Sequence, residues 1–318
     1  MENAQPSLAG SHPLAGPGLA MGSMIASQLG IVLAVPLMLA HGAFGTSAMR
    51  LVFAALLCIA WARPDVRRFD RRQWIGGLAL GATMAVMTMC YFEAASLIPV
   101  GPAITIDFLG PLGIAVLALR GWPRLLLPVL AAAGVLAVSY GEHGQWLNPT
   151  GILFALGAAC GWAGYIVLMR HVGRLFSAQD GLCLSLIVAA ALALPAALVL
   201  EPPSHWIGEL PVVAALAALS PLLPFALEMA ALRRMEMGNF SIVMSLEPAF
   251  GALFGFLILQ QALAPRQILG VLAVMAASAG AVLLPVLAAR GQRVRGWKQV
   301  QEFMPERRKT AACSLPVE

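Results

Sequence analysis

The chain has 318 residues, of which 60% are hydrophobic and only 11% charged, and its mean hydropathy is +0.83. Water-soluble domains average roughly 25% charged residues, so this composition excludes an ordinary soluble protein and indicates a membrane protein. The net charge of +5 comes from 20 Lys and Arg against 15 Asp and Glu.

Ten stretches meet or approach the length of about 20 mainly apolar residues that a membrane-spanning helix needs. In chain order they are Leu19–Leu39, Phe44–Trp61, Trp74–Ala94, Val100–Leu119, Pro123–Ser139, Thr150–Leu168, Gln179–Leu200, Leu210–Leu232, Met237–Leu259 and Pro265–Leu287, the fifth being short. We predict an all-α integral membrane protein. Residues 1–18 are expected to form a disordered tail, and residues 289–318 a basic soluble one.

No cleaved signal peptide is expected, because the first apolar run has no basic region before it and is long enough to span. Four of the five cysteines fall at scattered places in the predicted spans without a CxxC pair, which indicates small buried residues. The histidines lie in tails or loops without metal-ligand spacing. We therefore expect no metal site, no cofactor and no enzymatic motif.

Basic residues mark one set of predicted loops. Cytoplasmic loops carry an excess of Lys and Arg. Eighteen of the 20 basic residues fall after spans 2, 4, 6 and 8 or in the C-terminal tail, the exceptions being Arg50 inside span 2 and Arg266 at the edge of span 10. We predict that both termini are cytoplasmic, and we attribute the positive charge to topology, not to nucleic-acid binding.

A weak internal repeat appears at an offset of 137 residues. The offset places Gly101 on Gly238, Pro111 on Pro248 and Ala115 on Ala252. The loop before the first segment is uncharged, whereas the loop before the second contains two arginines, so the two helices run in opposite directions. We predict ten helices in two inverted five-helix repeats, 19–141 and 150–288, which is typical of secondary transporters with a binding site near the midplane.

Each copy of the repeat carries an acid close to its proline. Glu247 precedes Pro248 directly, and Asp107 lies four residues before Pro111. A carboxylate deep in a bilayer is costly and usually functional, and proline frees a backbone carbonyl of the preceding turn. Asp107 maps about one turn before Glu247, so we expect both acids to bind substrate or protons, in different roles. The alternative is a structural contact with a neighbouring helix.

Several segments resemble a known transporter family, namely Ile98–Leu112, Leu223–Leu232 and Met244–Ala249, together with Arg50 in Ala48–Leu51 and Trp162 in Cys160–Ala163. Over roughly residues 20–288 the chain resembles the EamA branch of the drug/metabolite transporter superfamily, and more closely the threonine/homoserine exporters of the Rht type. The resemblance implies a ten-helix inner-membrane carrier that moves small metabolites outward by proton exchange. Asp107 stands where relatives usually carry Glu, and Glu93 where an apolar residue is expected.

Two further charged residues within the spans are candidates for the same site. Glu228 is expected to bind protons or substrate, or else to pair with nearby Arg233. Arg50 is expected to hold a substrate carboxylate through two parallel hydrogen bonds. The alternatives for Arg50 are an outward-extended side chain or an ion pair with Glu93 or Asp107.

Three uncharged side chains complete the candidate set. Gln28 gives the first span a polar face and is expected to hydrogen-bond the substrate, although polar residues there also serve helix packing. Tyr91 and Trp162 are expected to stack on or cap a ligand, or else to pack helices.

The function expected from these residues is a proton-coupled exporter of small amino acids, of the threonine or homoserine type. A carrier of the same fold with drugs, purines or another metabolite as cargo is the alternative, and it would make Arg50 dispensable. An intramembrane enzyme is disfavoured because no nucleophile–base pair or metal cluster lies in the spans, and a channel gives no reason for paired acids in an inverted repeat. The expected partners are a small-molecule substrate, protons and the lipid bilayer, and a homodimer is left open.

Overall fold

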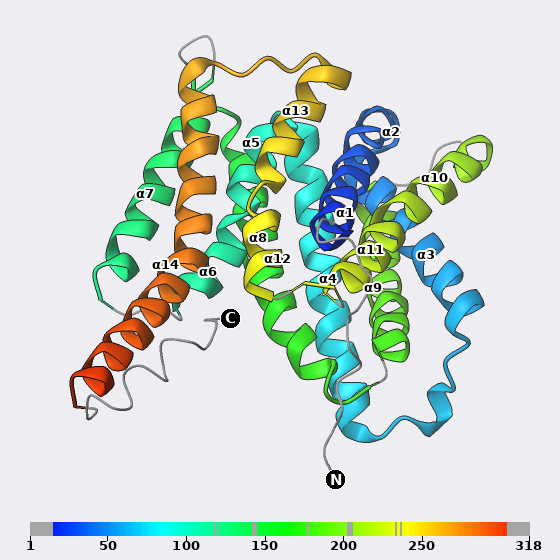
Figure 1. Cartoon of the computed structure of the whole chain (residues 1–318). Helices are drawn as coiled ribbons and strands as arrows, with labels where there is room; N and C mark the ends of the chain where they lie inside the picture. Colours follow the sequence, from blue (N-terminus) through cyan, green and yellow to red (C-terminus); the bar gives the residue numbers. More distant parts are fainter. Residues whose placement is uncertain are drawn as a thin grey trace.

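The computed structural model describes residues 15–303 except 118, 120, 142–144, 177, 202–205, 233 and 236. The regular elements of this part are all helices, arranged as one bundle (Figure 1). Its isolated β-bridge joins Tyr140 to Trp146. The predicted all-α class is confirmed for the described residues.

Several expected spans consist of more than one helix. The first half of the chain contains α1 (Ala15–Val32), α2 (Val35–His41), α3 (Ala43–Ala62), η1 (Val66–Arg68), α4 (Arg71–Leu97), α5 (Val100–Asp107), α6 (Leu109–Leu117) and α7 (Pro123–Val138). The second half contains α8 (Pro149–Val172), α9 (Ala178–Leu200), η2 (Trp206–Glu209), α10 (Leu210–Ala217), η3 (Ala218–Leu222), α11 (Leu223–Leu232), α12 (Met237–Met244), α13 (Glu247–Leu259) and α14 (Pro265–Phe303).

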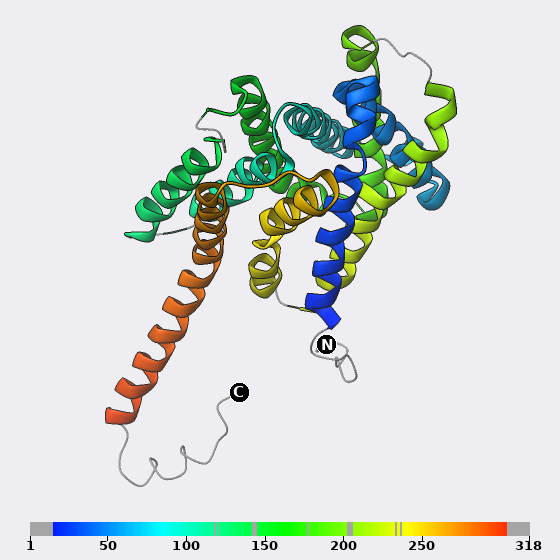
Figure 2. The ribbon, with the colours of Figure 1, turned by 90° about the horizontal axis from the view of Figure 1, so that it is seen from above.

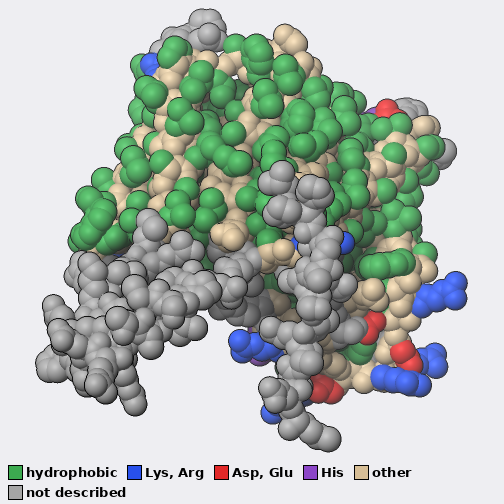
Figure 3. Space-filling model, viewed as in Figure 1, with side chains coloured by type: hydrophobic (Ala, Val, Ile, Leu, Met, Phe, Trp, Pro, Cys, Tyr) green, Lys and Arg blue, Asp and Glu red, His purple; other side chains and the backbone are tan. Residues whose placement is uncertain are grey.

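Nine helical stretches of the described residues are long and apolar enough to cross a membrane, and the apolar helix Pro123–Val138 is shorter. Large apolar side chains are exposed on the outside of the bundle, among them Leu39 at 72%, Leu125 at 73% and Val199 at 80%. Figure 3 shows a broad apolar surface, with most of the visible basic side chains near its lower end. Such a surface suits lipid, and the protein is a multi-pass membrane protein. The count of ten spans remains a prediction.

The ends of the chain differ from the expected boundaries. Helix α1 begins at Ala15, four residues before the expected span Leu19–Leu39. Pro17 is tolerated there because the N–H groups of a first helical turn have no helical partner. Helix α14 continues through the expected tail as far as Phe303. Residues 1–14 and 304–318, the remainder of both expected tails, lie outside the described residues.

The helices that carry the candidate residues pack against one another. Helix α4 packs along α8 and α9, α3 along α9, and α1 along α11 and α13, while α5 packs against α8 and α13. Helices α7 and α14 lie side by side at one edge (Figures 1 and 2). Helices α5 and α13 meet closely because Gly251 has no side chain: a Cβ there would lie 2.5 Å from Ile104 Cγ2.

Two helix breaks lie at equivalent places in the expected repeats. Helices α5 and α6 are separated by Phe108, and α12 and α13 by Ser245 and Leu246. The offset of 137 residues places Phe108 on Ser245. The carbonyls four residues before Pro111 and Pro248 lack their usual helical donor, because proline has no N–H.

Candidate functional site

The centre of the candidate site joins α1 to α13. Gln28 Nε2 donates a hydrogen bond of 3.2 Å to Glu247 Oε1. Both side chains are buried, at 0% and 6% exposure, and Gln28 Oε1 and Glu247 Oε2 have no hydrogen-bond partner. Glu247 is the first residue of α13, and a carboxylate is favoured at a helix N-terminus by the helix dipole.

Asp107 lies at the C-terminal end of α5, beside the same centre. Its side chain is 5% exposed, and Oδ1 has no hydrogen-bond partner. Asp107 and Glu247 are close enough for their charges to interact, and the buried Tyr91 of α4 interacts electrostatically with both. The hydroxyl of Tyr91 is also without a partner. Two of the predicted acids are therefore brought together with one predicted aromatic side chain.

Arg50 pairs with neither of the two acids named as its alternative partners, Glu93 and Asp107. Its Nη2 donates a hydrogen bond of 2.5 Å to the backbone carbonyl of Ser220, and its guanidinium lies 4.5 Å from the centre of the Phe92 ring. The side chain is 4% exposed, so it does not extend to the surface. The ion pairs of the described residues do not include Arg50 with Glu93 or Asp107.

Glu228 lies toward the end of α11 and approaches the same centre from that helix. Its Oε1 accepts a hydrogen bond of 2.8 Å from Ser23 Oγ of α1. Glu228 is close enough to Glu247 for the two acids to interact electrostatically. Arg233, its expected alternative partner, lies outside the described residues.

Trp162 packs against the break in the first half. Its ring meets that of Phe108 edge to face, with centroids 5.6 Å apart. Phe108 directly follows Asp107, so Trp162 supports the backbone at that acid. Both prolines lie just past a break, Pro111 in the first turn of α6 and Pro248 in the first turn of α13.

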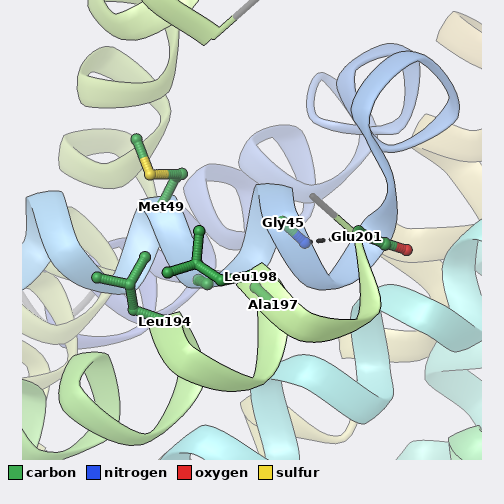
Figure 4. A pocket seen from close by; sticks show the side chains of 7 residues that line it. Gly45, Met49, Leu194, Ala197, Leu198 and Glu201 are labelled. Atoms are coloured by element: carbon green, nitrogen blue, oxygen red, sulfur yellow. Dashed lines mark hydrogen bonds between the residues drawn. The ribbon is translucent and has the colours of Figure 1, made fainter. Parts of the chain in front are cut away.

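A second polar arrangement connects the start of α3 to the end of α9. Glu201 Oε2 accepts a hydrogen bond of 2.8 Å from the backbone N–H of Gly45, beside a small pocket that Met49 and Leu194 also line (Figure 4). Gly42, the N-cap of α3, has φ +85° and no side chain to cap the helix, so Glu201 caps it from another helix.

The end of α2 is held nearby. His41 Nε2 lies 2.8 Å from Glu209 Oε2, the last residue of η2. The turn between α2 and α3 is thus bound by carboxylates from both sides of the connection between α9 and α10.

The roles of Ser220 and Glu201 were not predicted from the sequence. Ser220 has non-helical dihedral angles, φ −155° and ψ 117°, between α10 and α11. A signal was present, because Pro221 disfavours the helical conformation of the residue before it. Pro224 also removes the N–H that would bond the Ser220 carbonyl in a helix. Nothing near Glu201 in the sequence indicates its partner, which is 156 residues away.

Among the described residues, no group of three or more His, Cys, Asp or Glu side chains could hold a metal ion. The buried polar groups of the site are therefore carboxylate, amide, guanidinium and phenol groups. These groups suit the binding of a small charged molecule or a proton.

The sequence of the chain is similar to those of known proteins. Residues 149–293 match the sequence model of the EamA-like transporter family. Over 267 residues the chain is 33% identical to the threonine/homoserine exporter RhtA of Salmonella typhimurium (strain SL1344) and to that of Escherichia coli (strain K12), which covers 82% of this chain and 89% of each relative. The chain belongs to the EamA-like transporter family. The predicted resemblance is confirmed, and membership in the EamA-like family indicates a transporter, not an enzyme.

A solved structure described as "Crystal structure of protein" is similar to this EamA-like chain with a TM-score of 0.55 and 19% identity. The likeness covers 85% of this chain and 96% of that structure. At this identity it supports the fold alone.

Proposed function

We propose that the protein is a secondary transporter that exports small amino acids, of the threonine or homoserine type, in exchange for protons. The names of the RhtA relatives support this cargo class. The alternative is a carrier of the same fold whose cargo is a drug or another metabolite, and transport measurements with threonine distinguish the two.

The observation that carries the proposal is a set of three buried oxygens without hydrogen-bond partners. They are Asp107 Oδ1, Glu247 Oε2 and Gln28 Oε1. A buried acceptor without a partner costs about 1–3 kcal/mol, so the site favours a ligand that brings N–H donors. An ammonium group brings three N–H donors, no acceptor and a positive charge. The amino group of an amino acid meets all of these requirements.

Proton exchange follows from the same two carboxylates. Negative charges close together in a region shielded from water are unfavourable unless a proton or a cation joins them. In our proposal Asp107 and Glu247 bind either the ammonium group or a proton, so that release of one permits binding of the other. Glu228, held by Ser23 of α1, is proposed as a further proton site toward the end of α11.

The other candidate residues have supporting roles in this proposal. Gln28 orients Glu247, Tyr91 and Trp162 close the sides of the site, and Pro111 and Pro248 open the backbone next to the acids. The paired breaks support two inverted repeats, 19–141 and 150–288, with ten spans in all. A site between half-helices near the midplane suits alternating access from the two sides.

The proposed location is the bacterial inner membrane, with both termini in the cytoplasm. The excess of basic residues in alternate loops supports this orientation. A dimer is compatible with the proposal, which places the whole site within one chain.

The proposal is tested with inverted membrane vesicles, whose lumen corresponds to the outer side of the cell. Vesicles that contain the protein should accumulate labelled threonine when the lumen is acidified, and a protonophore should abolish this accumulation. The Glu247→Gln variant should reduce the rate at least about tenfold, because a charge-assisted hydrogen bond to the ammonium group is lost.

Asp65→Asn is the matched control, because Asp65 lies in an exposed loop and pairs with Arg68. Accumulation that is equal with and without the protein would exclude threonine as cargo. Accumulation that is unaffected by the protonophore would exclude proton exchange.

A further inference from the structure

The guanidinium of Arg50 is buried but only partly hydrogen-bonded. Nη2 donates to the Ser220 carbonyl, whereas Nε and Nη1 have no hydrogen-bond partner. The Phe92 ring lies over one face of the guanidinium, with its centre 4.5 Å from Arg50 Cζ, and the N–H groups point outward in the plane of the guanidinium.

Among the residues that the structure describes, the positive charge of Arg50 has no negative partner. The charged pairs of the described residues, His41 with Glu209 and Arg68 with Asp65, do not include Arg50. A charge buried without a counter-ion is strongly unfavourable, and buried charges are normally paired. The arrangement therefore favours an anionic group that comes from outside the chain.

The Ser220 carbonyl is a weaker partner than an anion, and it is available for a local reason. In an unbroken helix it would accept from the residue four positions later, but that residue is Pro224, which has no N–H. Arg50 satisfies this carbonyl in the described state. A carboxylate brings a full negative charge and two acceptor oxygens, which match a guanidinium better than a single carbonyl does.

Arg50 also faces elements that hold the proposed ammonium site. Gly30, two residues after Gln28 on α1, packs against Ser220, where a Cβ would lie 2.6 Å from Ser220 Cβ. Phe92, beneath the guanidinium, directly follows Tyr91 on α4. The surroundings of Arg50 thus include α1 and α4, the two helices that carry Gln28 and Tyr91. An α-amino acid has an ammonium group and a carboxylate group attached to the same carbon atom. The ammonium group would complement the acids, and the carboxylate would complement Arg50.

We propose that Arg50 binds the free carboxylate of the cargo through its unpaired nitrogens and so selects amino acids over amines and amides. The inference rests on the proposed function, since it assigns a binding partner to the carboxylate of the same amino-acid cargo. It differs from a purely structural role, in which Arg50 only holds the break at Ser220 in place.

The test compares threonine with threonine amide, which keeps the ammonium and hydroxyl groups but lacks the anionic carboxylate. Uptake of both labelled compounds is measured in the same inverted vesicles. The ratio of the two rates does not depend on the amount of protein in the membrane. We expect the unaltered protein to prefer threonine at least about tenfold, because a site built for a polar group rejects an analogue that lacks it.

In Arg50→Gln the preference should fall toward one, mainly through loss of threonine transport. Arg50→Lys should lie between the two, because Lys keeps the charge but not the planar set of donors. The control is Arg68→Gln at an exposed arginine, and it should keep the original ratio. If Arg50→Gln is too unstable to assay, the ratio in Arg50→Lys decides the matter.

An unchanged ratio in the Arg50 variants, with both rates lowered equally, would show that Arg50 only supports the break and would overturn the inference alone. Absence of threonine transport in the unaltered protein would overturn the proposed function and the inference with it.

Discussion

Gln28 and Glu247, 219 residues apart in the chain, share one hydrogen bond and leave one oxygen each without a partner. The bond connects the first span to the first turn of α13, where the helix is broken. It fixes the position of one carboxylate oxygen and directs no protein donor to the other. This is the arrangement expected of a carboxylate that is held in place for a ligand.

The coupling between these two side chains can be measured. Gln28→Ala leaves Glu247 without its donor, which should lower threonine transport and cost about 1–3 kcal/mol of stability. In the double variant with Glu247→Gln the two effects should not add, because the residues are in direct contact. A double-mutant cycle on thermal unfolding in detergent checks this, and strict additivity would contradict the contact.

Gly30 provides a test of the break at Ser220. Gly30→Ala should lower both stability and transport, by about 1–3 kcal/mol in the unfolding free energy, because the new methyl group overpacks the contact with Ser220. Gly22→Ala is the matched control on the same helix, since its Cβ would meet Leu227 Cδ1 at an ordinary 3.6 Å. That substitution should be neutral or slightly stabilising. Equal effects at the two glycines would argue against a close approach at Ser220.

Glu201 should contribute to stability through the start of α3. Glu201→Ala removes the cap and should cost about 0.5–2 kcal/mol. Glu201→Gln keeps an acceptor oxygen and should cost less. Hydrogen exchange of the amides in the first turn of α3 locates the effect, and exchange that is unchanged in Glu201→Ala would show that the cap is dispensable.

The two prolines beside the acids should be needed for turnover more than for folding. Pro248→Ala restores a backbone N–H that can bond the Met244 carbonyl and make the span continuous. We expect higher thermal stability together with slower transport, since a continuous helix no longer opens the backbone beside Glu247. Vesicle transport and thermal unfolding of the same preparation check the two expectations, and transport at the original rate would show that the break is not required.

The breaks beside Pro111 and Pro248 could be anticipated from the sequence because proline acts on its own helix. The missing N–H and the freed carbonyl lie within four residues of the ring. The burial of Asp107 and Glu247 could also be anticipated, since both lie inside long apolar stretches. These features are local, and local chemistry fixes them.

The partners of Arg50 and Glu201 could not be anticipated, because each depends on how distant helices pack. Arg50 bonds a carbonyl 170 residues away, and Glu201 an amide 156 residues away. The sequence did contain half of each signal: the prolines around Ser220 indicate an unpaired carbonyl, and Gly42 indicates a helix start without its own cap. Only the packing of α3 against α9 and η3 shows that Arg50 bonds the Ser220 carbonyl and that Glu201 caps α3.

Helix α14 extends well beyond the apolar window Pro265–Leu284, as far as Phe303. At about 1.5 Å per residue its 39 residues reach about 58 Å, roughly twice the thickness of a hydrocarbon core. The last helix is therefore both a membrane anchor and a rigid rod that stands out from the bilayer. A protein fused directly after Phe303 would be held away from the lipid headgroups, and would follow any tilt of α14 against α7.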